Sequence, residues 1–463
     1  MQIDASIFKA YDIRGVVDKT LTEEAVRAVG RVLGSLALEA GAPSFCVARD
    51  GRLSGERLLG ALIDGISSTG IKVLNAGAVP TPVLYYATKF FGNGTGVAVT
   101  GSHNPPEWNG LKMMVGGETL YGEAIQDIHR RAEAGEWTTT AKPGEVVNVD
   151  AVTPYIEKAL SGIEIKRRLK IVGDAGNGIG GPTMLALFSR LNVDLVPLYC
   201  DPDGTFPNHH PDPSKPKNLQ DLIAKVKDEH ADYGFALDGD GDRLGVVTNK
   251  GEIIYPDRLM MLFAEDILTR RPGEPIVYDV KCSRKLVDWV RAKGGVPMIS
   301  PTGHSLVKAK LRETKAPFAG EMSGHLFFND ERWTGFDDGL YAAVRLLEIL
   351  SRSEDPSGTL AALPNAVNTP ELQIPMAEGE PKRFIERFRA EAEYPEFPDA
   401  EDIITVDGVR VEWKDGFALA RASNTTPVVV VRFEGDTKEA LQRIREKFIS
   451  EMRRVEPNLA LPE

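Results

Sequence analysis

Cysteine is scarce in this 463-residue sequence, which contains only Cys46, Cys200 and Cys282, far apart from one another. Because their number is odd and no CxxC pair occurs, neither a disulfide framework nor a zinc site is indicated. Long apolar runs are also missing, and none approaches the ~18 residues that a membrane-spanning helix needs. The N-terminal segment has neither a basic stretch nor an apolar core, which argues against a signal peptide. These absences predict a cytoplasmic protein without a membrane partner.

Excess positive charge is absent as well. The 55 Lys and Arg residues are outnumbered by 67 Asp and Glu residues, which gives a formal net charge of −12. Binding to nucleic acid relies on clustered basic side chains, so nucleic acid is not expected as a partner. An anionic substrate must then bind in a locally basic cleft. The length exceeds the ~250–300 residues of a single core, which predicts three or four domains.

The sequence contains three copies of one pattern, in which a strand, a loop with an Asp, a helix and a second strand follow one another. The copies begin at Ser44 (SFCVARDGRLSG), Arg167 (RRLKIVGDAGNGIGG) and Glu274 (EPIVYDVKCSRK). Each copy leads into a further strand and an unusual loop: TGSHNPP at 100–106, DGDGDR at 238–243 and GEMSGH at 320–325. Open α/β sheets bind ligands at the carboxyl ends of their strands, so we expect the three loops to face one cleft.

The remainder of the chain differs from these repeats. Residues 402–435 alternate around two Asp-Gly turns, as antiparallel hairpins do, and an amphipathic helix opened by Thr437 follows. The predicted fold class is therefore α/β, with three related α/β domains of mixed sheets and a smaller C-terminal α+β domain around a central cleft. Turn-rich and proline-rich segments place the domain limits at 1–147, 148–252, 253–367 and 368–463.

Three carboxylates alternate with glycine in DGDGDR. The glycines allow the backbone to bend so that Asp238, Asp240 and Asp242 converge on one cation, and hard oxygen ligands select Mg²⁺, Ca²⁺ or Mn²⁺. A calcium EF-hand loop needs Gly and Glu where this chain has Arg243 and Asn249. A solvated acidic turn is the alternative without function. Three carboxylates leave much of an octahedral shell open to water and substrate phosphate, which indicates phosphate chemistry.

Ser102 lies in TGSHNPP, at the end of a predicted strand. An acyl-transfer nucleophile with His103 as its base is one interpretation, but the GxSxG elbow is absent, and we do not expect adjacent residues to present both side chains to one reacting centre. A plain turn is another, because Gly, Ser and Asn are common turn residues. Beside a metal loop in an equivalent position, Ser102 is better explained as a phosphoryl acceptor.

Two further loops carry polar side chains suited to a sugar phosphate. Glu321 and Ser323 are two residues apart in GEMSGH and can bond to neighbouring sugar hydroxyls. RASNTTP, residues 421–427, offers an Arg fork and neutral donors, which suits a phosphate clamp. A capped turn and a tight hairpin, respectively, are the alternatives without function.

A dinucleotide-binding pattern is also present. GNGIGG, residues 176–181, satisfies GxGxxG and has Asp201 about twenty residues downstream. A nicotinamide-dependent dehydrogenase is therefore the rival hypothesis. Against it, the other two copies of the repeat carry no such glycines, and the metal loop would have no task.

The combined motifs resemble those of the α-D-phosphohexomutase family, specifically its bacterial phosphomannomutase/phosphoglucomutase group. The resemblance spans the chain, because the following motifs occur in the family's order: KAYDIRG (9–15), TGSHNPP, DGDGDR, PTGHS (301–305), GEMSGH and RASNTTP. It implies a reversible conversion of hexose 1-phosphate and hexose 6-phosphate, of glucose or mannose. Met322 stands where glucosamine-phosphate mutases usually have Gln, which favours hexose over hexosamine.

The resemblance also implies roles for individual residues. Ser102 is expected to be the phosphoserine, and its phosphoryl group is expected to bind Mg²⁺ together with Asp238, Asp240 and Asp242. Glu321 and Ser323 are expected to recognise the sugar hydroxyls. A clamp on the phosphate that does not react is expected from Arg421, Ser423, Asn424 and Thr425. Other expected cleft residues, with duties in substrate binding, charge balance or proton transfer, are Tyr11, Arg14, His103, Lys112, Arg243, Lys281, His304 and His325.

The implied mechanism passes through a bisphosphate. Phosphorylated Ser102 gives its phosphoryl group to a hexose monophosphate, the 1,6-bisphosphate turns end for end in the cleft, and the opposite phosphate returns to Ser102. The expected cofactors are Mg²⁺ and, as activator, glucose 1,6-bisphosphate or mannose 1,6-bisphosphate. Sugar phosphates are the expected partners of a monomer whose last domain closes about the proline-rich segment 351–381. A binding or regulatory protein on the same scaffold is the non-enzymatic alternative.

Overall fold

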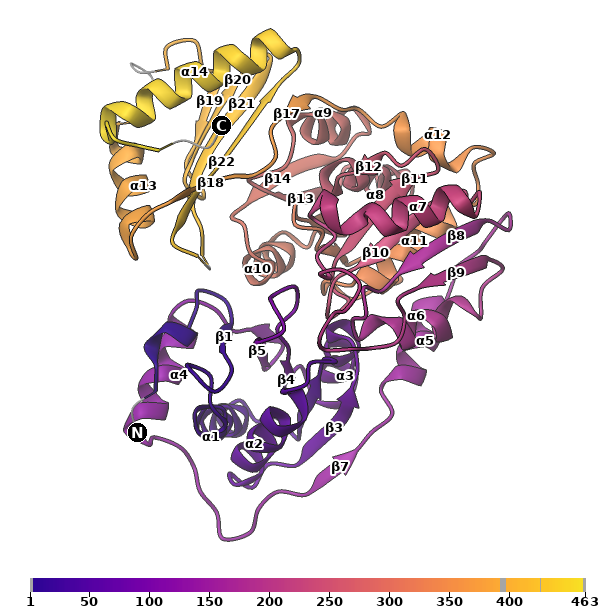
Figure 1. Ribbon diagram of the computed structural model, residues 1–463. Coiled ribbons are helices and arrows are strands. Elements are labelled where there is room, and N and C mark those ends of the chain that lie inside the picture. Colours follow the sequence, from indigo (N-terminus) through magenta and orange to yellow (C-terminus); the bar gives the residue numbers. More distant parts are fainter. Residues whose placement is uncertain (1–2, 392–396, 425, 461–463) are drawn as a thin grey trace.

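Four sheets organise the protein, each formed by a different part of the chain (Figure 1). The structure is a computed structural model that describes residues 3–391, 397–424 and 426–460. The first sheet has the order β1-β5-β4-β2-β3-β7, with β6 paired to β5. Its strands are β1 (Ile13–Val16), β2 (Phe45–Arg49), β3 (Val73–Ala78), β4 (Gly96–Val99), β5 (Trp108–Val115), β6 (Glu118–Thr119) and β7 (Val146–Asn148). The accompanying helices are η1 (Ala5–Ile7), α1 (Glu23–Glu39), α2 (Gly55–Ser67), α3 (Thr81–Phe91) and α4 (Glu123–Ala134).

The second sheet has the order β12-β11-β10-β8-β9 and the third β14-β13-β15-β16. The strands of the second are β8 (Lys170–Asp174), β9 (Asp194–Leu198), β10 (Tyr233–Leu237), β11 (Leu244–Thr248) and β12 (Ile253–Ile254). Its helices are α5 (Val152–Leu160), α6 (Gly180–Phe188), η2 (Pro216–Leu219) and α7 (Gln220–Asp228). The third has β13 (Pro275–Asp279), β14 (Val296–Ser300), β15 (Phe318–Gly320) and β16 (Leu326–Phe328). Its helices are α8 (Pro256–Arg270), α9 (Arg284–Ala292), α10 (His304–Thr314), α11 (Gly339–Leu350) and α12 (Pro356–Ala361).

The three sheets share one order of strands. The sequences β5-β4-β2-β3, β11-β10-β8-β9 and β16-β15-β13-β14 are equivalent, with parallel pairing in the middle and an antiparallel hairpin at one side. Each unusual loop connects the two strands of that hairpin. The strands before the loops, such as β10, are buried along their whole length, as their continuous apolar sequence predicts. The predicted threefold repeat is confirmed.

The fourth sheet is antiparallel and has the order β17-β22-β21-β20-β19, with β18 paired to β22. Its strands are β17 (Val367–Asn368), β18 (Leu372–Pro375), β19 (Asp402–Ile404), β20 (Val409–Trp413), β21 (Gly416–Ala422) and β22 (Val428–Gly435). The helices are α13 (Glu380–Glu391) and α14 (Lys438–Val455). Thr437 accepts the N–H of Ala440 at 3.1 Å and so caps α14, as predicted. Three α/β domains and a smaller C-terminal domain are thus confirmed.

Apolar cores join the first three domains more closely than the fourth. One continuous core includes Tyr85 of the first domain, Phe235 of the second and Phe328 of the third. The C-terminal domain (orange to yellow in Figure 1, with β19–β22 and α14 in yellow) has a separate core, and a small cluster around Phe417 connects it to the third domain. None of the helices in the described ranges is both long and apolar enough to cross a membrane.

Candidate active site

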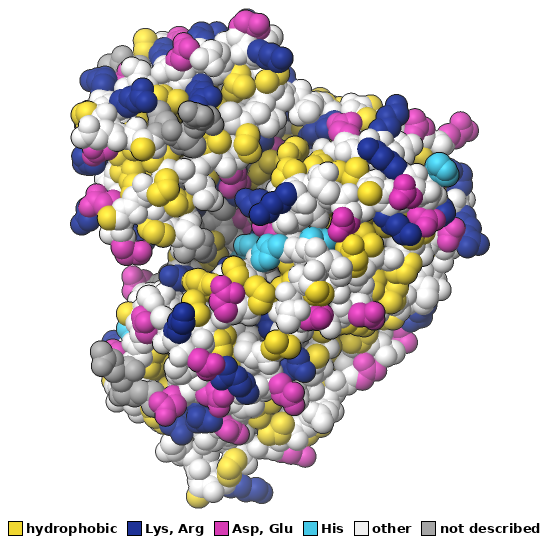
Figure 2. Space-filling model, viewed as in Figure 1, with side chains coloured by type: hydrophobic (Ala, Val, Ile, Leu, Met, Phe, Trp, Pro, Cys, Tyr) yellow, Lys and Arg dark blue, Asp and Glu magenta, His cyan; other side chains and the backbone are white. Residues whose placement is uncertain are grey.

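The unusual loops meet at one cleft with a volume of about 600 Å³. All four domains line it, with Ser102 from the first, Arg243 from the second, Glu321 from the third and Arg421 from the fourth. Figure 2 shows the hollow between the C-terminal domain and the rest of the molecule, with histidine and basic side chains at its edge. The expectation that the loops face one cleft is confirmed.

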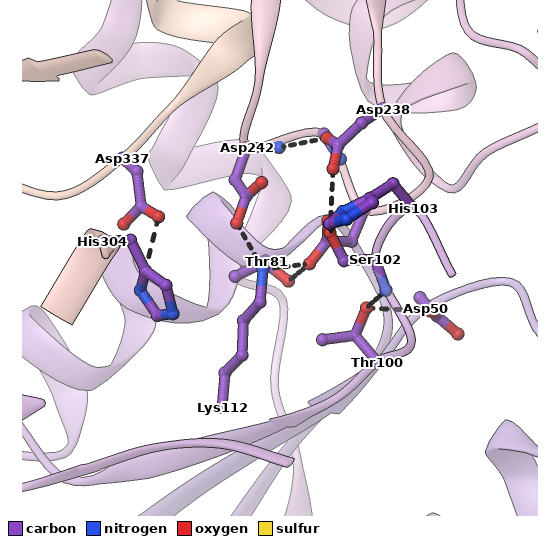
Figure 3. Close-up of polar contacts among 12 residues, drawn as sticks. Asp50, Thr81, Thr100, Ser102, His103, Lys112, Asp238, Asp242, His304 and Asp337 are labelled. Carbon is purple, nitrogen blue, oxygen red and sulfur yellow. Dashed lines mark hydrogen bonds and ion pairs between the residues drawn. The ribbon is translucent and has the colours of Figure 1, made fainter. Parts of the chain in front are cut away.

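Ser102 lies in the turn between β4 and β5 and is 1% exposed. Its φ of 48° is in the left-handed region, which residues other than glycine rarely adopt. The Oγ donates to Asp238 Oδ2 at 3.0 Å and lies 3.2 Å from His103 Nδ1 (Figure 3). The expectation that adjacent Ser and His side chains do not meet at one centre is wrong, because the left-handed turn brings both to the same side.

Arg52 binds the backbone of the loop that carries Ser102. Its Nη2 donates to the backbone oxygen of Ser102 at 2.8 Å, and the guanidinium also binds the carbonyl oxygens of Asn104, Pro105 and Trp108. Asp50 accepts from Arg52 Nε at 3.2 Å and from the N–H of Gly101 at 3.0 Å. One buried ion pair therefore maintains the strained backbone at Ser102.

Asp238, Asp240 and Asp242 follow β10 and bring carboxylate oxygens within 4.8 Å of one another, all buried. Asp238 Oδ1 accepts three backbone N–H groups, of residues 241–243, each at 3.1 Å. Lys112 on β5 donates to Asp240 Oδ2 at 2.8 Å and to Asp242 Oδ2 (Figure 3). Within the part of the chain that the structure describes, Asp240 Oδ1 and Asp242 Oδ1 are buried without hydrogen-bond partners. This arrangement is an acidic site able to hold a metal ion.

The charges in this cluster balance one another. Burial and the neighbouring aspartates raise the pKa of Asp238 well above its ordinary value. Burial opposes ionisation of Asp240, but Lys112 and the Thr81 hydroxyl, which donates at 2.6 Å, hold the pKa of Asp240 below its ordinary value. Burial also disfavours the Lys112 ammonium, yet the aspartates raise its pKa. Lys112 is therefore a permanent cation at neutral pH.

The loop between β15 and β16 presents Glu321 and Ser323 to the cleft. Glu321 Oε1 accepts the N–H of Gly303 at 2.7 Å, whereas Glu321 Oε2 and Ser323 Oγ are buried and find no hydrogen-bond partner in the described ranges. Asp279, the aspartate of the third repeat copy, accepts the N–H of Met322 at 3.0 Å and fixes the loop. Burial raises the pKa of Glu321. Two unpaired oxygen atoms are thus available to a ligand rich in hydroxyls.

Two imidazoles lie beside the aspartate cluster. Burial and the nearby Lys308 ammonium hold the pKa of His304 well below its ordinary value, so His304 is neutral at neutral pH. Its Nδ1 lies 3.8 Å from Asp337 Oδ2 (Figure 3). His325 Nε2 accepts from Arg243 Nε at 3.0 Å, and His325 Nδ1 lies 3.1 Å from Asp337 Oδ2.

The C-terminal domain contributes Arg421, at the end of β21. Its Nε donates to Asp407 Oδ2 at 2.8 Å, whereas its Nη2 is buried and has no hydrogen-bond partner among the described residues. Asp407 also accepts a backbone N–H of the PTGHS loop at 2.9 Å and so connects the two domains. Ser423 and Asn424 line the cleft, and the fourth predicted clamp residue, Thr425, lies outside the described residues.

The other predicted residues, Tyr11, Arg14 and Lys281, also line the cleft. Arg14 Nη1 donates to Asn104 Oδ1 at 3.0 Å, and Lys281 Nζ donates to Glu371 Oε1 at 2.8 Å. Every predicted site residue that the structure describes therefore lines the cleft or bonds to a side chain that lines it.

GNGIGG follows β8 but packs against the aspartate loop. Ile179 donates its N–H to Gly239 O at 3.1 Å, and a Cβ on Gly181 would lie 2.0 Å from Cys200 O. Close backbone contact therefore explains these glycines without a bound dinucleotide.

Comparison with known proteins assigns these features to one family. Family descriptions of phosphoglucomutase/phosphomannomutase alpha/beta/alpha domains I, II and III match residues 5–139, 153–251 and 255–367, and that of the C-terminal domain matches residues 371–451. The chain belongs to the phosphoglucomutase/phosphomannomutase family. The resemblance inferred from the motifs is confirmed, and the dehydrogenase hypothesis is wrong.

Relatives in this family match the chain over nearly its full length. A phosphoglucomutase of Neisseria meningitidis is 51% identical over 461 residues, which is 99% of both chains. A phosphomannomutase/phosphoglucomutase of Pseudomonas aeruginosa is 50% identical over 99% of this chain and 98% of its own. The crystal structure of a phosphoglucomutase/phosphomannomutase family protein from Burkholderia thailandensis is 52% identical, covers 100% of both chains and has a TM-score of 0.94.

Sequence reasoning missed several residues that position the groups of this family site. Arg52 and Asp50 could have been found from one sequence signal, because an Asp recurs in the first loop of each repeat. Asp337, Lys308 and Asp407 had none, because they stand outside the motifs and reach the site only through the tertiary fold.

Proposed function

We propose that this family member is a phosphoglucomutase/phosphomannomutase in which Ser102 carries the phosphoryl group between a hexose 1-phosphate and a hexose 6-phosphate. The observation that carries the proposal is the position of Ser102 Oγ, 3.0 Å from the buried three-aspartate cluster and within a cleft that also contains the unpaired Arg421 Nη2. A nucleophile, a cation site and an anion site thus occur in one cleft.

Mg²⁺ fits the donor set, which consists of hard oxygen atoms. Asp238, Asp240 and Asp242 would hold it, with an oxygen of phosphorylated Ser102 as a further ligand, and the two unpartnered carboxylate oxygens support this assignment. When bound, the ion supplies charge neutralisation to the phosphoryl group during transfer. The predicted Ca²⁺ and Mn²⁺ alternatives share the same oxygen chemistry, but Mg²⁺ is the usual ion for phosphate chemistry with few protein ligands.

Transfer requires charge balance and a proton acceptor. Lys112 and Arg243 are cations beside the aspartates and stabilise the phosphoryl group as it moves. The bond between phosphorus and Ser102 Oγ breaks as the bond to the sugar oxygen forms, and the proton of the sugar hydroxyl passes to the imidazole of His304 or His325. In the second half, the other phosphate returns to Ser102 and the proton returns to the departing sugar oxygen.

Recognition has to work in two orientations of the sugar. Glu321 Oε2 and Ser323 Oγ offer free bonding capacity to adjacent hydroxyls, and Arg421 offers a free N–H to whichever phosphate is distant from Ser102. Ser423, Asn424 and Thr425 complete the proposed clamp. The walls of the cleft are completed by the predicted residues Tyr11, Arg14, Lys281 and His103.

The remaining details belong to the same proposal. Glucose 1,6-bisphosphate or mannose 1,6-bisphosphate would activate the enzyme by phosphorylating Ser102. Met322, which has no side-chain amide for an acetamido or amino group, supports a hexose over a hexosamine. That the protein is a cytoplasmic monomer, and that its domains have the four limits given above, stay predictions.

Phosphorus NMR tests the proposal. The purified protein with Mg²⁺ and a trace of glucose 1,6-bisphosphate receives glucose 1-phosphate, mannose 1-phosphate or glucosamine 1-phosphate in separate samples. Conversion of the hexose 1-phosphates to 6-phosphates is expected, with the amino sugar slowest. Release of free phosphate alone, or no change in any sample, would overturn it.

A further inference from the structure

Thr81 lies in the first turn of α3 and makes two hydrogen bonds to one residue of the aspartate loop. Its Oγ1 donates to Asp240 Oδ2 at 2.6 Å, and its backbone N–H donates to Asp240 O at 3.0 Å. The two residues are 159 positions apart in the chain and belong to different domains. Thr81 is buried, with 2% of its surface exposed. The first domain therefore binds directly to the acidic site of the second.

The local sequence fixes the position of Thr81. Pro80 and Pro82 flank it, and a proline ring restricts the backbone φ angle at each of these two positions. The N–H of Thr81 is one of the first-turn donors that have no acceptor within the helix, so it is available to Asp240 O. Further along α3, Leu84 is part of the continuous core that joins the first three domains. The helix therefore cannot move away from the aspartate loop without loss of packing.

The bond from Thr81 determines which oxygen of Asp240 is left for a cation. Oδ2 accepts from Thr81 Oγ1 and, at 2.8 Å, from Lys112 Nζ (Figure 3). Oδ1 is buried and has no hydrogen-bond partner among the described residues, and Asp240 belongs to the group of carboxylates able to hold a metal ion. Rotation about the bond between Cβ and Cγ would exchange the two oxygens, and this torsion is soft in aspartate. The donors to Oδ2 oppose that rotation.

Lys112 alone controls this orientation less well than Thr81. Its ammonium stands at the end of a flexible four-carbon chain, and it also bonds to Asp242 Oδ2. Threonine is branched at Cβ and its χ1 angle is restricted, so its hydroxyl occupies a defined position. The direction of the Asp240 carboxylate is therefore set by Thr81, whereas Lys112 supplies the counter-charge.

We propose that Thr81 is a positioning residue of the first domain that orients the Asp240 carboxylate of the second domain, so that Oδ1 faces the cation. The inference rests on the proposed function, because it concerns the Mg²⁺ of the phosphoryl-transfer site. Loss of a hydrogen-bonded partner behind a metal-binding carboxylate typically weakens metal binding about 10–100-fold. Thr81 thereby makes the affinity for the metal depend on the contact between the two domains.

Thr81→Val tests the inference, because valine has the shape of threonine, including the branch at Cβ, but no hydroxyl. Mn²⁺ prefers the same oxygen ligands as Mg²⁺, and electron paramagnetic resonance measures the free ion as Mn²⁺ is titrated into the protein. We expect the Kd of Mn²⁺ to rise about 10–100-fold. The Mg²⁺ concentration that gives the half-maximal rate should rise similarly, whereas the KM for glucose 1-phosphate at saturating Mg²⁺ should change less than about threefold.

Two further variants separate this role from a purely structural one. Thr81→Ser keeps the hydroxyl and should bind Mn²⁺ with a Kd within about threefold of the wild type. Thr88→Val removes another buried hydroxyl of α3, which donates to Tyr85 O at 2.8 Å instead of to an aspartate. We expect the Kd of Mn²⁺ to be unchanged in Thr88→Val even if the melting temperature falls.

A Kd of Mn²⁺ in Thr81→Val within about threefold of the wild type would overturn the inference. So would equal rises of the Kd in Thr81→Val and Thr88→Val, or a wild type that binds no Mn²⁺. Thr81→Ala, which only removes atoms, gives the same measurement should Thr81→Val fail to fold. The titration needs no turnover, so failure of the proposed function would be seen separately, as absent mutase activity in the wild type.

Discussion

The three-domain body and the C-terminal domain are held together by different forces. Within the body, one apolar core runs through all three sheets, so the serine loop and the aspartate loop have little freedom to separate. The C-terminal domain contacts the body through a small apolar cluster and through charged side chains. Arg410 binds Val280 O and Cys282 O, Arg432 binds Lys281 O, and Lys281 pairs with Glu371.

This difference matches two separate tasks, which are phosphoryl transfer in the three-domain body and binding of the distant phosphate by the C-terminal domain. Phosphoryl transfer needs groups held within fractions of an ångström, which a packed core provides. A clamp that accepts either phosphate of a turning bisphosphate needs movement, which polar contacts and a single linker allow. Changes in the body should therefore affect kcat and folding, and changes in the C-terminal domain should affect KM and closure.

The largest effect is expected from Ser102→Ala. Without the Oγ nucleophile, kcat should fall by at least about 10⁴-fold, while glucose 1-phosphate still binds through the intact clamp. Coupled kinetics and isothermal titration calorimetry measure the two quantities. Mass spectrometry after treatment with glucose 1,6-bisphosphate should find one phosphate on the wild type and none on the variant. Turnover at the wild-type rate would remove Ser102 from the mechanism.

Lys112→Met should lower both kcat and the stability of the three-domain body. The buried aspartates lose their counter-charge, so we expect kcat to fall about 10²–10³-fold and the free energy of unfolding to fall by about 3–5 kcal/mol. Denaturant unfolding and kcat measurements check this. Lys89→Met on α3 is the control, because the Lys89 ammonium makes an exposed hydrogen bond to Thr334 O and the substitution should cost less than about 0.5 kcal/mol. Equal losses in the free energy of unfolding for Lys112→Met and Lys89→Met would contradict the prediction.

Arg421→Lys should weaken capture with little effect on the body. A lysine cannot reproduce the fork that bonds to Asp407 and leaves Nη2 free, so the KM for glucose 1-phosphate should rise about 10–100-fold. The melting temperature of the body should not change. Arg443→Lys, on the outside of the same domain and paired with Asp415 at 2.6 Å, is the matched control. A fall in kcat with an unchanged KM would place Arg421 in the chemical step instead.

The smallest effect is expected from Glu371→Gln, at the junction of the two regions. Burial opposes ionisation, but Lys281 holds the pKa of Glu371 at about 2, below its ordinary 4.5. A lowered carboxyl pKa contributes stability above the ordinary pKa, and this stability is lost as the pH falls toward the folded pKa. Differential scanning calorimetry should therefore show a lower melting temperature for the variant at neutral pH and a difference that shrinks between pH 4.5 and 2. Exposed Glu378→Gln is the control, and a difference independent of pH would exclude this ion pair as the cause.

Much of the fold could be predicted because local patterns repeat. The β-loop-α-β copies, the antiparallel hairpins near the C-terminus and the Thr437 cap each depend on residues close together in sequence. The predicted meeting of three loops followed from the equivalence of their strands, without any knowledge of contacts. The pairing of Ser102 with His103 was not anticipated, because a positive φ at a serine has no sequence signature.

Local sequence therefore specified which chemical groups this protein has and at which strand ends they stand. Tertiary structure alone decided which groups become partners. It brings Arg52 to the backbone of the serine loop, Lys112 to two aspartates and Asp337 to His325. The reason is physical, since strand and turn formation depend on near neighbours, whereas burial of a charge requires a counter-charge that packing brings from a distant part of the chain.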